Sequence, residues 1–472
     1  MSAERAPAAK RHRADDDAGD ANDAAPGAAV AAAASSPTRA LEFYCGVGGL
    51  HYSLLRARPD ASVVAAFDVN PHGNDVYEHN FGVRPLQRNL LSFPAERIDK
   101  FAASLWLMSP PCQPFTRQGH QRDTADGRSQ SFLRLLDEMT NLRTPPTHVL
   151  VENVVGFETS EMRDVMLETF RRLGFTTKER VLSPRMFGVP YSRPRYFCLA
   201  KRAPLRWVDG FDDPDADRGP IRAPPPSRLS HPSHWVPASH VDDLRPVDPT
   251  EATTPRARRR EGESAEDAAK AAKAAAAAEK AANPDRETKT YGVARLEAFM
   301  ETGADGNEDD DDGDGEGASG GASDRGASNG GASNRANDLW RSYAVSRAEI
   351  EKGLASIDAV TASDRKCNCF TKSYGKYVKG TGSFVASRAV VKGEWDGRVN
   401  NAPDDEEAPG SNPREGVSLR YFTEREVANI HSFPPEFGFP ESVTRAQRYA
   451  LLGNSLSVAC VAPLVDYLLD DA

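Results

Sequence analysis

The sequence predicts an α/β fold built on a mostly parallel sheet. Between residues 40 and 205, short apolar runs alternate with stretches of helical periodicity, which is the pattern of consecutive β-α-β units. The apolar runs end in glycine, acidic or other polar residues. Because ligands of such sheets bind beyond the carboxyl ends of the strands, these ends form the expected functional site.

The expected elements follow one another in a regular order. The first strand is "ALEFY", followed by a glycine turn and the start of a helix, and the second is "SVVAAF", which is followed by an acid. "LWLM" and "HVLV" are further buried strands, whereas "SQSFLRLLDEMTNL" and "EMRDVMLETFRRLG" have the periodicity of helices. The chain ends in an apolar helix at "ACVAPLVDYLL".

Two regions lack the composition of a core. Residues 1–38 are rich in Ala, Asp and Pro without apolar periodicity, and we expect them to form a disordered tail. Residues 250–340 combine an Ala/Lys/Glu stretch, an acidic Gly-rich run and the degenerate repeat "GASGGASDRGASNGGASN". Such a composition cannot bury a core, so this region is predicted to be a flexible insertion.

Charge and cysteine content limit the classes of function. No run of about 18 apolar residues occurs, so no membrane span is expected. The six cysteines show no disulfide spacing, which favours the cytosol or the nucleus. The net charge is −10, but residues 301–317 alone hold nine Asp/Glu, whereas residues 361–395 hold seven Lys/Arg and two Asp/Glu. The overall acidity therefore does not exclude a nucleic-acid partner, which would meet a local basic face.

The turn "FYCGVGG" and Asp68 indicate a cofactor. Glycines after a first strand let the backbone approach a ligand closely, and the N-terminus of the next helix offers free N–H groups. Asp68 ends the second strand, where an acid accepts hydrogen bonds from ribose hydroxyls. Together they predict an adenosine-bearing cofactor. The alternatives are that the glycines form only a turn and that Asp68 caps the next helix.

Cys112 follows two prolines at the end of an apolar run, in "SPPCQPF". The prolines fix a turn that presents the side chain outward. A thiol in such a place becomes a nucleophile when nearby cations or N–H groups lower its pKa. The alternative, an inert buried thiol, suits Cys198 and Cys460 better, because these lie inside apolar runs.

Three charged side chains are expected beside this thiol. Glu152 follows buried residues at the end of a strand, where a carboxyl group can exchange a proton with a ring nitrogen. Arg193 and Arg195 alternate along the expected strand "YSRPRYF" and would point to one face, where they could grip a phosphate or a base oxygen. The alternatives are an ion pair for Glu152 and solvated charges for the arginines.

The motifs "FYCGVGGL", "FDVN", "SPPCQPFTRQG", "ENVVGF", "SRPRYF" and "QRYALLGNSLSVACV" resemble, in this order, those of the cytosine-5 methyltransferases. The resemblance implies a Rossmann-like class I methyltransferase domain that uses S-adenosyl-L-methionine. It implies that Cys112 adds to C6 of cytosine, that Glu152 protonates N3, and that both arginines hold the base. The implied cofactor contacts are Val47, Gly48, Gly49, Asp68, Val69, Asn89, Leu90, Ser109, Asn454 and Ser455.

The resemblance also implies a division into domains. Residues 39–205 would form the catalytic domain, 206–249 and 341–400 a smaller target-recognition region, and 415–472 a C-terminal segment that returns to the catalytic domain.

The stretch "KCNCFTKSYGKYVKGTGSF" favours RNA as the substrate. Its lysines alternate with tyrosines, which suits phosphate contacts and stacking on unpaired bases. It resembles the Cys-Phe-Thr signature of the branch of the family that methylates the anticodon-loop cytosine, of the position 38 type, in tRNA-Asp. Its Cys-x-Cys pair could bind zinc only with a second pair of ligands, and none lies nearby in the sequence, so no metal is expected. The expected nucleic-acid contacts are Lys366, Cys369, Phe370, Thr371, Lys372, Tyr374, Tyr377, Gly380, Thr381, Gly382 and Ser383.

Two other functions remain open at this point. A DNA cytosine-5 methyltransferase would use the same site residues, and an inactive cofactor-binding scaffold would act through its acidic insertion. We expect a monomer in the cytoplasm or the nucleus, with tRNA as its partner and without a membrane or a metal.

Overall fold

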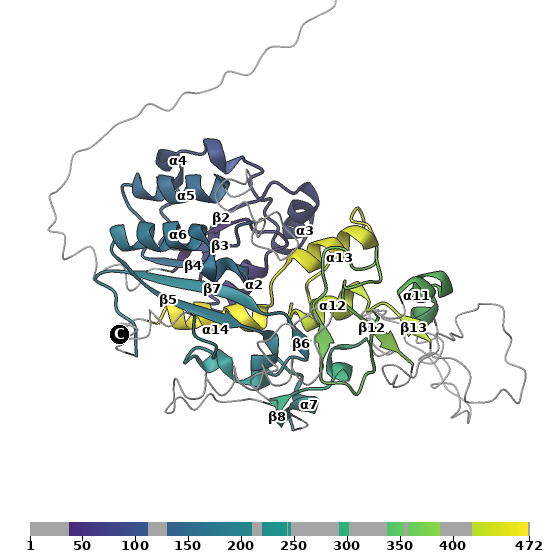
Figure 1. The fold of residues 1–472 in the computed structure, drawn as a ribbon. Helices are drawn as coiled ribbons and strands as arrows, with labels where there is room; N and C mark the ends of the chain where they lie inside the picture. The colour runs from purple at the N-terminus through teal and green to yellow at the C-terminus, as the bar shows by residue number, and fades with distance from the viewer. Residues whose placement is uncertain are drawn as a thin grey trace, which may run out of the picture. The chain divides into compact units, whose positions relative to one another are not determined.

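A six-stranded mixed sheet forms the centre of the computed structural model, which describes residues 37–111, 130–209, 220–242, 244–246, 292–301, 338–353, 357–387 and 418–470 (Figure 1). The strands are β1 (Arg39–Phe43), β2 (Ser62–Phe67), β3 (Leu105–Met108), β4 (His148–Val154), β5 (Phe175–Leu182) and β7 (Arg195–Arg202). Their order is β2-β1-β3-β4-β7-β5. The first four are parallel to one another, whereas β7 is antiparallel to β4 and β5. The predicted α/β fold is confirmed.

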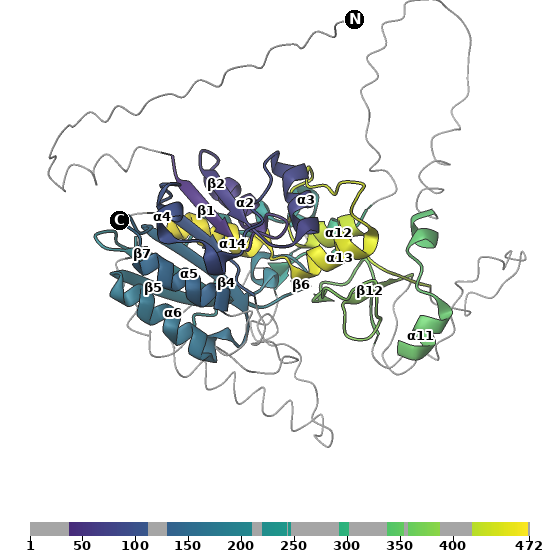
Figure 2. The same ribbon diagram turned by 90° about the horizontal axis from the view of Figure 1, so that it is seen from above.

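Helices cover both faces of this sheet (Figures 1 and 2). On one face lie α2 (Gly49–Ala57) and α14 (Val458–Leu468), and on the other α5 (Gln130–Thr140) and α6 (Glu161–Arg172). The remaining helices are α3 (Pro71–Phe81), α4 (Ala95–Asp99), α7 (Ala238–Val241), α11 (Arg347–Gly353), α12 (Glu424–Ile430) and α13 (Arg445–Asn454).

Local sequence accounts for these elements. In β3, Leu107 belongs to the core under α2 and α14, whereas Trp106 belongs to the core under α5 and α6. A strand with two buried faces must be apolar throughout, since successive side chains point to opposite faces. The helices begin at polar caps: the Ser160 side chain accepts from the first turn of α6, and Thr444 forms a capping box with Gln447 in α13.

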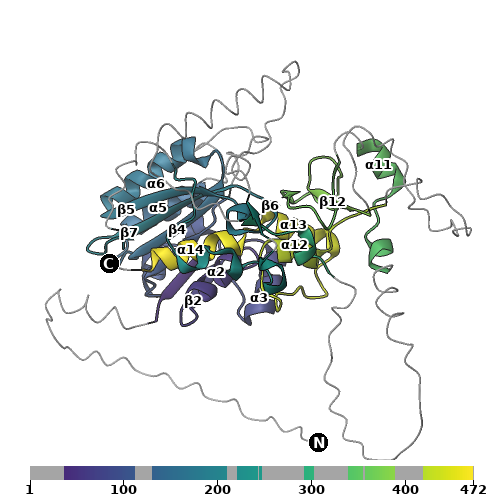
Figure 3. The same cartoon turned by 90° about the horizontal axis from the view of Figure 1, so that it is seen from below.

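A smaller assembly lies beside the main sheet (Figures 1 and 3). Its three-stranded sheet has the order β10-β12-β13, and all three views place β12 beside α12 and α13. Two further strand pairs are β6 with β11 and β8 with β9. The bounds of these strands are β6 (Tyr191–Ser192), β8 (Arg245–Pro246), β9 (Gly292–Val293), β10 (Asp358–Val360), β11 (Cys367–Asn368), β12 (Ser383–Ala386) and β13 (Leu419–Arg420).

The structure differs from two predicted boundaries. Residues 415–472 are predicted to return to the catalytic domain; α14 packs along the main sheet, whereas β13, near the start of this segment, pairs with β12 of the smaller sheet. Residues 292–301, inside the predicted insertion, are packed rather than flexible. Val293, Leu296 and Phe299 are at most 4% exposed. The sequence shows their spacing of three residues, but the acidic residues that follow lower the average hydrophobicity of the region.

The segment Arg445–Leu468 is the one stretch of the described residues long and apolar enough to span a membrane by composition. This segment comprises α13 and α14, and 89% of its most apolar stretch of 18 residues is buried inside the protein. Burial of this kind is typical of core helices of a large domain.

Candidate active site

Asp68 holds the glycine turn between β1 and α2. One of its carboxylate oxygens accepts from the N–H of Gly46 at 2.8 Å, and the other accepts from the N–H of Asn70 at 2.8 Å. Gly46 and Gly48 have φ angles of +53° and +86°, which other residues rarely adopt. Asn70 is the cap of α3, so the alternative of Asp68 as helix cap is wrong.

Space for a ligand lies beside this turn. A Cβ atom added to Gly46 would meet nothing within 4 Å, and Val69, directly after Asp68, is 66% exposed. Because a carboxylate offers about four lone-pair positions, Asp68 retains acceptors for ribose hydroxyls. Three further residues were predicted to contact the cofactor. Val47, in the glycine turn, and Leu90 are buried, and Asn89 is exposed.

The returning C-terminal segment packs against the same turn. A Cβ atom on Gly49 would lie 2.9 Å from Cδ1 of Leu456 and 3.3 Å from Oγ of Ser455. Asn454, the last residue of α13, is exposed. The structure therefore brings together the two parts of the predicted cofactor site that are most distant in sequence.

Glu152 lies near the end of β4, and its carboxylate contacts one cationic side chain and one hydroxyl group. Ser109 donates its O–H to Oε2 at 2.6 Å, and Nε of Arg195 lies 3.3 Å from Oε1. Glu152 is 7% exposed. The ion pair named above as the alternative is therefore present, and it holds the carboxylate at the predicted edge of the sheet.

The chain that leads to Cys112 is fixed next to this carboxylate. The side-chain amide of Asn153 donates to the carbonyl oxygen of Pro110 at 3.3 Å. Cys112 itself lies outside the described residues, and Pro111 alone separates it from Pro110. The position of the thiol beside Glu152 stays a prediction.

Arg193 and Arg195 do not share one strand as predicted. β6 ends before Arg193 and β7 begins at Arg195, because Pro194 lacks the N–H that a continuous ladder requires. Arg193 is 2% exposed, and its guanidinium donates to the carbonyl oxygens of Phe370 at 3.1 Å and Gly453 at 2.9 Å. Arg195 is therefore the arginine beside the carboxylate of the site, whereas Arg193 is enclosed by protein.

Arg193 also lies against a thiol. Its Nη1 atom donates to Sγ of Cys369 at 3.2 Å. Burial raises the pKa of the Cys369 thiol, but Arg193 and Arg195 outweigh this effect and hold that pKa below its usual value. Burial raises the pKa of the other four cysteines that the structure describes, which are Cys45, Cys198, Cys367 and Cys460.

The predicted nucleic-acid stretch has a buried part and an exposed part. The ring of Tyr374 is 1% exposed, and its Oη donates to the carbonyl oxygen of Ser383 at 2.8 Å and accepts from the N–H of Phe422 at 2.9 Å. The prediction that Tyr374 stacks on a base is therefore wrong. Phe370, Thr381, Gly382 and Ser383 are likewise buried.

Tyr377 is 57% exposed and has Nζ of Lys376 5.4 Å from its ring centre. Lys372, Lys379 and Gly380 are also exposed, and Lys366, Cys369 and Thr371 are half-buried. The structure thus offers one aromatic ring and several lysines to a polynucleotide.

Glu42, beneath the glycine turn, is a site residue that the sequence did not predict. It is fully buried at the end of β1 and accepts from Oη of Tyr77 at 2.9 Å. Burial raises the pKa of Glu42 to about 8, although the hydrogen bond from Tyr77 opposes this shift. Its position inside the apolar strand "ALEFY" could have identified Glu42 from the sequence, because buried carboxyl groups are rare.

The pair Tyr191 and His431 was also missed. Burial, with a further contribution from Arg193, lowers the pKa of His431 well below its ordinary value, so the ring is neutral. Its Nδ1 lies 2.8 Å from the carbonyl oxygen of Val427, which can only accept, and Nε2 therefore accepts from Oη of Tyr191 at 3.2 Å. No local pattern predicts this contact, because the two residues are far apart in sequence.

These features fit a nucleoside cofactor better than a metal. The retained acceptors of Asp68, the exposed Val69 and the open side of Gly46 would hold an adenosine. Within the described residues, no group of three or more His, Cys, Asp and Glu side chains could bind a metal ion.

Comparison with known proteins agrees with this geometry. Residues 38–468 match the family described as C-5 cytosine-specific DNA methylase. The chain is 32% identical over 436 residues to the tRNA (cytosine(38)-C(5))-methyltransferase of Homo sapiens, with 92% of this chain and 99% of that protein covered. It is 29% identical over 435 residues to a DNA (cytosine-5)-methyltransferase of Dictyostelium discoideum, with 91% and 94% covered.

Two solved structures are similar over most of the chain. A crystal structure of a triple mutant of DNMT2 from Spodoptera frugiperda has a TM-score of 0.60 and 25% identity, and covers 92% of this chain and 100% of that one. The crystal structure of the S. pombe Dnmt2 methyltransferase has a TM-score of 0.57 and 26% identity, with 92% and 98% covered. Because the family match spans nearly the whole described chain, this protein belongs to the C-5 cytosine-specific DNA methylase family and is a methyltransferase with S-adenosyl-L-methionine as its methyl donor.

Proposed function

We propose that this methyltransferase modifies C5 of cytosine 38 in the anticodon loop of tRNA, with tRNA-Asp as its substrate, through a covalent adduct between Cys112 and C6. The observation that carries the proposal is the cluster of Glu152, Ser109 and Arg195 next to the fixed Pro110. Support for tRNA comes from the human relative, which is named a tRNA (cytosine(38)-C(5))-methyltransferase.

The reaction needs a nucleophile because C5 of cytosine is unreactive by itself. The thiolate of Cys112 would add to C6, while Glu152 gives a proton to N3, so that the electron pair of the C5–C6 bond becomes available at C5. The bound cofactor supplies an electrophilic methyl group. After C5 has taken the methyl group, a solvent base removes the C5 proton and the C6–S bond breaks, while N3 returns its proton to Glu152. These steps restore the aromatic ring, the free thiolate and the carboxyl group.

The contacts of Glu152 suit this role. Ser109 and Arg195 each hold one carboxylate oxygen, which fixes the plane of the carboxyl group toward the end of β4. Arg195 provides positive charge close to the place where negative charge develops on the ring. Arg193, enclosed by Phe370 and Gly453, acts on the site through other residues.

The exposed half of the stretch at 366–383 supports RNA. Lysine side chains and the ring of Tyr377 suit phosphates and an unpaired base, respectively. An anticodon loop already presents unpaired bases, so the energetic cost of placing cytosine in the pocket is lower than in a duplex.

The test is transfer of labelled methyl groups from S-adenosyl-L-methionine to total tRNA, to a tRNA-Asp transcript, and to genomic DNA. We expect label in tRNA-Asp, none after cytosine 38 is replaced by uridine, and none with Cys112→Ala. Cys460→Ala, at a buried thiol, is the matched control and should keep activity. Label confined to DNA would refute the proposal and favour the activity named for the Dictyostelium relative.

The covalent step has its own test. RNA with 5-fluorocytosine at position 38 cannot lose the C5 substituent as a proton, so the adduct should persist and shift the protein on a denaturing gel. Cys112→Ala should bind the cofactor and give no shifted band. A shifted band with this variant would show that another residue is the nucleophile.

A further inference from the structure

We propose that Arg193 is a positioning residue that connects the RNA-contacting stretch at 369–383 to the cofactor-closing turn at 453–455, so that binding of RNA and binding of cofactor strengthen each other. The inference rests on the proposed function, because it takes the first stretch to contact RNA.

The two ends of the Arg193 guanidinium serve two different segments. Nη1 donates to the carbonyl oxygen of Phe370 at 3.1 Å and to Sγ of Cys369 at 3.2 Å. Nη2 donates to the carbonyl oxygens of Gly453, at 2.9 Å, and Ser455. Because the guanidinium is rigid and planar, it fixes the distance and orientation of these two segments.

Burial makes this connection energetically important. Arg193 is 2% exposed, so water cannot replace a partner that moves away. A buried donor that loses its acceptor destabilises the protein, and more so when the donor is charged. Displacement of the stretch at 369–370 or of the turn at 453–455 would leave part of the charged group unsatisfied, and each segment therefore opposes movement of the other.

A second contact joins the same two segments. A Cβ atom on Gly453 would lie 2.3 Å from the carbonyl carbon of Thr371 and 2.4 Å from the backbone nitrogen of Lys372. The end of α13 thus packs directly on the backbone of the exposed basic stretch. Leu456, just beyond, contacts the first turn of α2 at Gly49.

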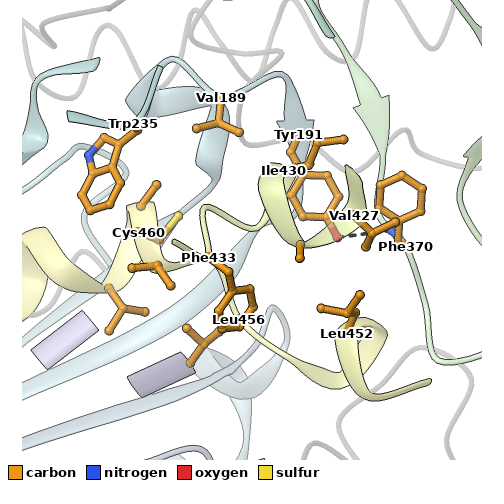
Figure 4. Packing of buried hydrophobic residues seen from close by; sticks show 14 of the residues in the cluster. Val189, Tyr191, Trp235, Phe370, Val427, Ile430, Phe433, Leu452, Leu456 and Cys460 are labelled. Carbon is orange, nitrogen blue, oxygen red and sulfur yellow. Dashed lines mark hydrogen bonds between the residues drawn. The ribbon is translucent and has the colours of Figure 1, made fainter. Parts of the chain in front are cut away.

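The packing around Arg193 supports this arrangement. Figure 4 shows Leu452 and Leu456, which precede and follow the turn, and the hydrogen bond between Tyr191 and Phe370 near Val427. Tyr191 accepts from the N–H of Phe370 at 3.3 Å and from Arg193 at 3.3 Å. The stretch is therefore held at its buried end, while its lysines and Tyr377 remain exposed.

This arrangement has a measurable consequence. RNA that orders the basic stretch also orders Gly453 and Ser455, and these residues adjoin the glycine turn that would hold the cofactor. By thermodynamic linkage, the cofactor must raise the affinity for RNA by the same factor as RNA raises the affinity for the cofactor.

The experiment measures the dissociation constant of S-adenosylhomocysteine, which carries no methyl group to transfer, with and without a saturating tRNA-Asp transcript. The coupling ratio is the dissociation constant without tRNA divided by the dissociation constant with tRNA. We expect at least about a fivefold ratio for the natural protein, the lower end of typical coupling. Arg193→Lys keeps the charge but cannot serve both segments, so its ratio should fall close to 1.

Two further variants keep the experiment decisive. Gly453→Ala should also lower the ratio, because the added methyl group separates α13 from Thr371. Arg420→Lys is the matched control: Arg420 is also 2% exposed, but its guanidinium bonds to the carboxylate of Glu426 and the carbonyl oxygen of Tyr421. This control should keep the ratio even if its melting temperature falls.

The results separate the connection from the proposed function. A ratio of 1 in the natural protein, an unchanged ratio in folded Arg193→Lys or Gly453→Ala, or an equal loss in Arg420→Lys would overturn the role of Arg193. Methyl transfer to tRNA is measured in parallel on the natural protein. Absence of transfer refutes the proposed function, whereas transfer with a ratio of 1 refutes the connection alone.

Discussion

Replacing Glu42 by Gln should change how the stability of this protein depends on pH. Burial raises the pKa of the folded Glu42 carboxyl from 4.5 to about 8. Between these two values the unfolded chain has lost this proton and the folded chain retains it. Stability from this group is therefore complete below pH 4.5 and is lost as the pH rises through 8. Gln has the same shape and no proton to lose.

The size of the effect follows from the shift. Each pH unit in this range lowers the free energy of unfolding by about 1.4 kcal/mol, so the loss approaches about 4 kcal/mol at pH 8. Two neighbours affect the natural protein and Glu42→Gln alike. Burial lowers the pKa of His51 from 6.5 to about 4, so below about pH 6.5 this ring gives both proteins a slope of opposite sign, which cancels in their difference. Burial raises the pKa of Tyr77 well above 10, outside the range of the assay.

The assay is urea unfolding of the two proteins at pH 5, 6, 7 and 8. The difference in free energy of unfolding should grow with pH in favour of Glu42→Gln. Glu441→Gln removes an exposed carboxyl group and is the control, for which no such trend is expected. Parallel pH curves for the natural protein and Glu42→Gln would show that the buried group is ionised throughout this range and would refute the reasoning.

Two further predictions concern Cys369 and residues 292–301. Because Arg193 and Arg195 hold the pKa of Cys369 below its usual value, iodoacetamide at pH 7.5 should alkylate it faster than Cys45 or Cys367, as measured by mass spectrometry of the peptides. Equal rates would contradict the lowered pKa. Deleting residues 292–301 should lower the melting temperature, since three apolar side chains worth about 1.5–3 kcal/mol each leave the core. Deleting residues 305–314, in the acidic run, is the control of equal length, and equal losses would contradict this.

The parts of the fold that the sequence predicted are those set by local patterns. The strands around the site are apolar on both faces and end at polar residues, so Asp68 and Glu152 could be placed at one edge of the sheet before the structure was known. Residues 292–301 were assigned incorrectly because composition was averaged over a long region. Their three buried residues are too few to change that average.

The stretch at 366–383 shows where local patterns stop being informative. Tyr374 and Tyr377 are similar by sequence, with lysines nearby, yet one is enclosed and the other is 57% exposed. The difference comes from Phe422 and Tyr449, which reach the stretch from the C-terminal part of the chain. The exposure of each tyrosine therefore depends on residues that are distant from it in the sequence.

The same reasoning explains why Arg193 was placed with the substrate. In the sequence it is one of two arginines spaced as on a strand, and its partners at 370, 453 and 455 become visible only after folding. Tyr191 and neutral His431 belong to the same buried network. Tyr191 bonds to His431, and Arg193 bonds to residues 370, 453 and 455, so these hydrogen bonds form only when the distant segments are in place. A ligand that displaces one segment must disturb the others, which makes this junction the natural place for occupancy of one site to affect the other.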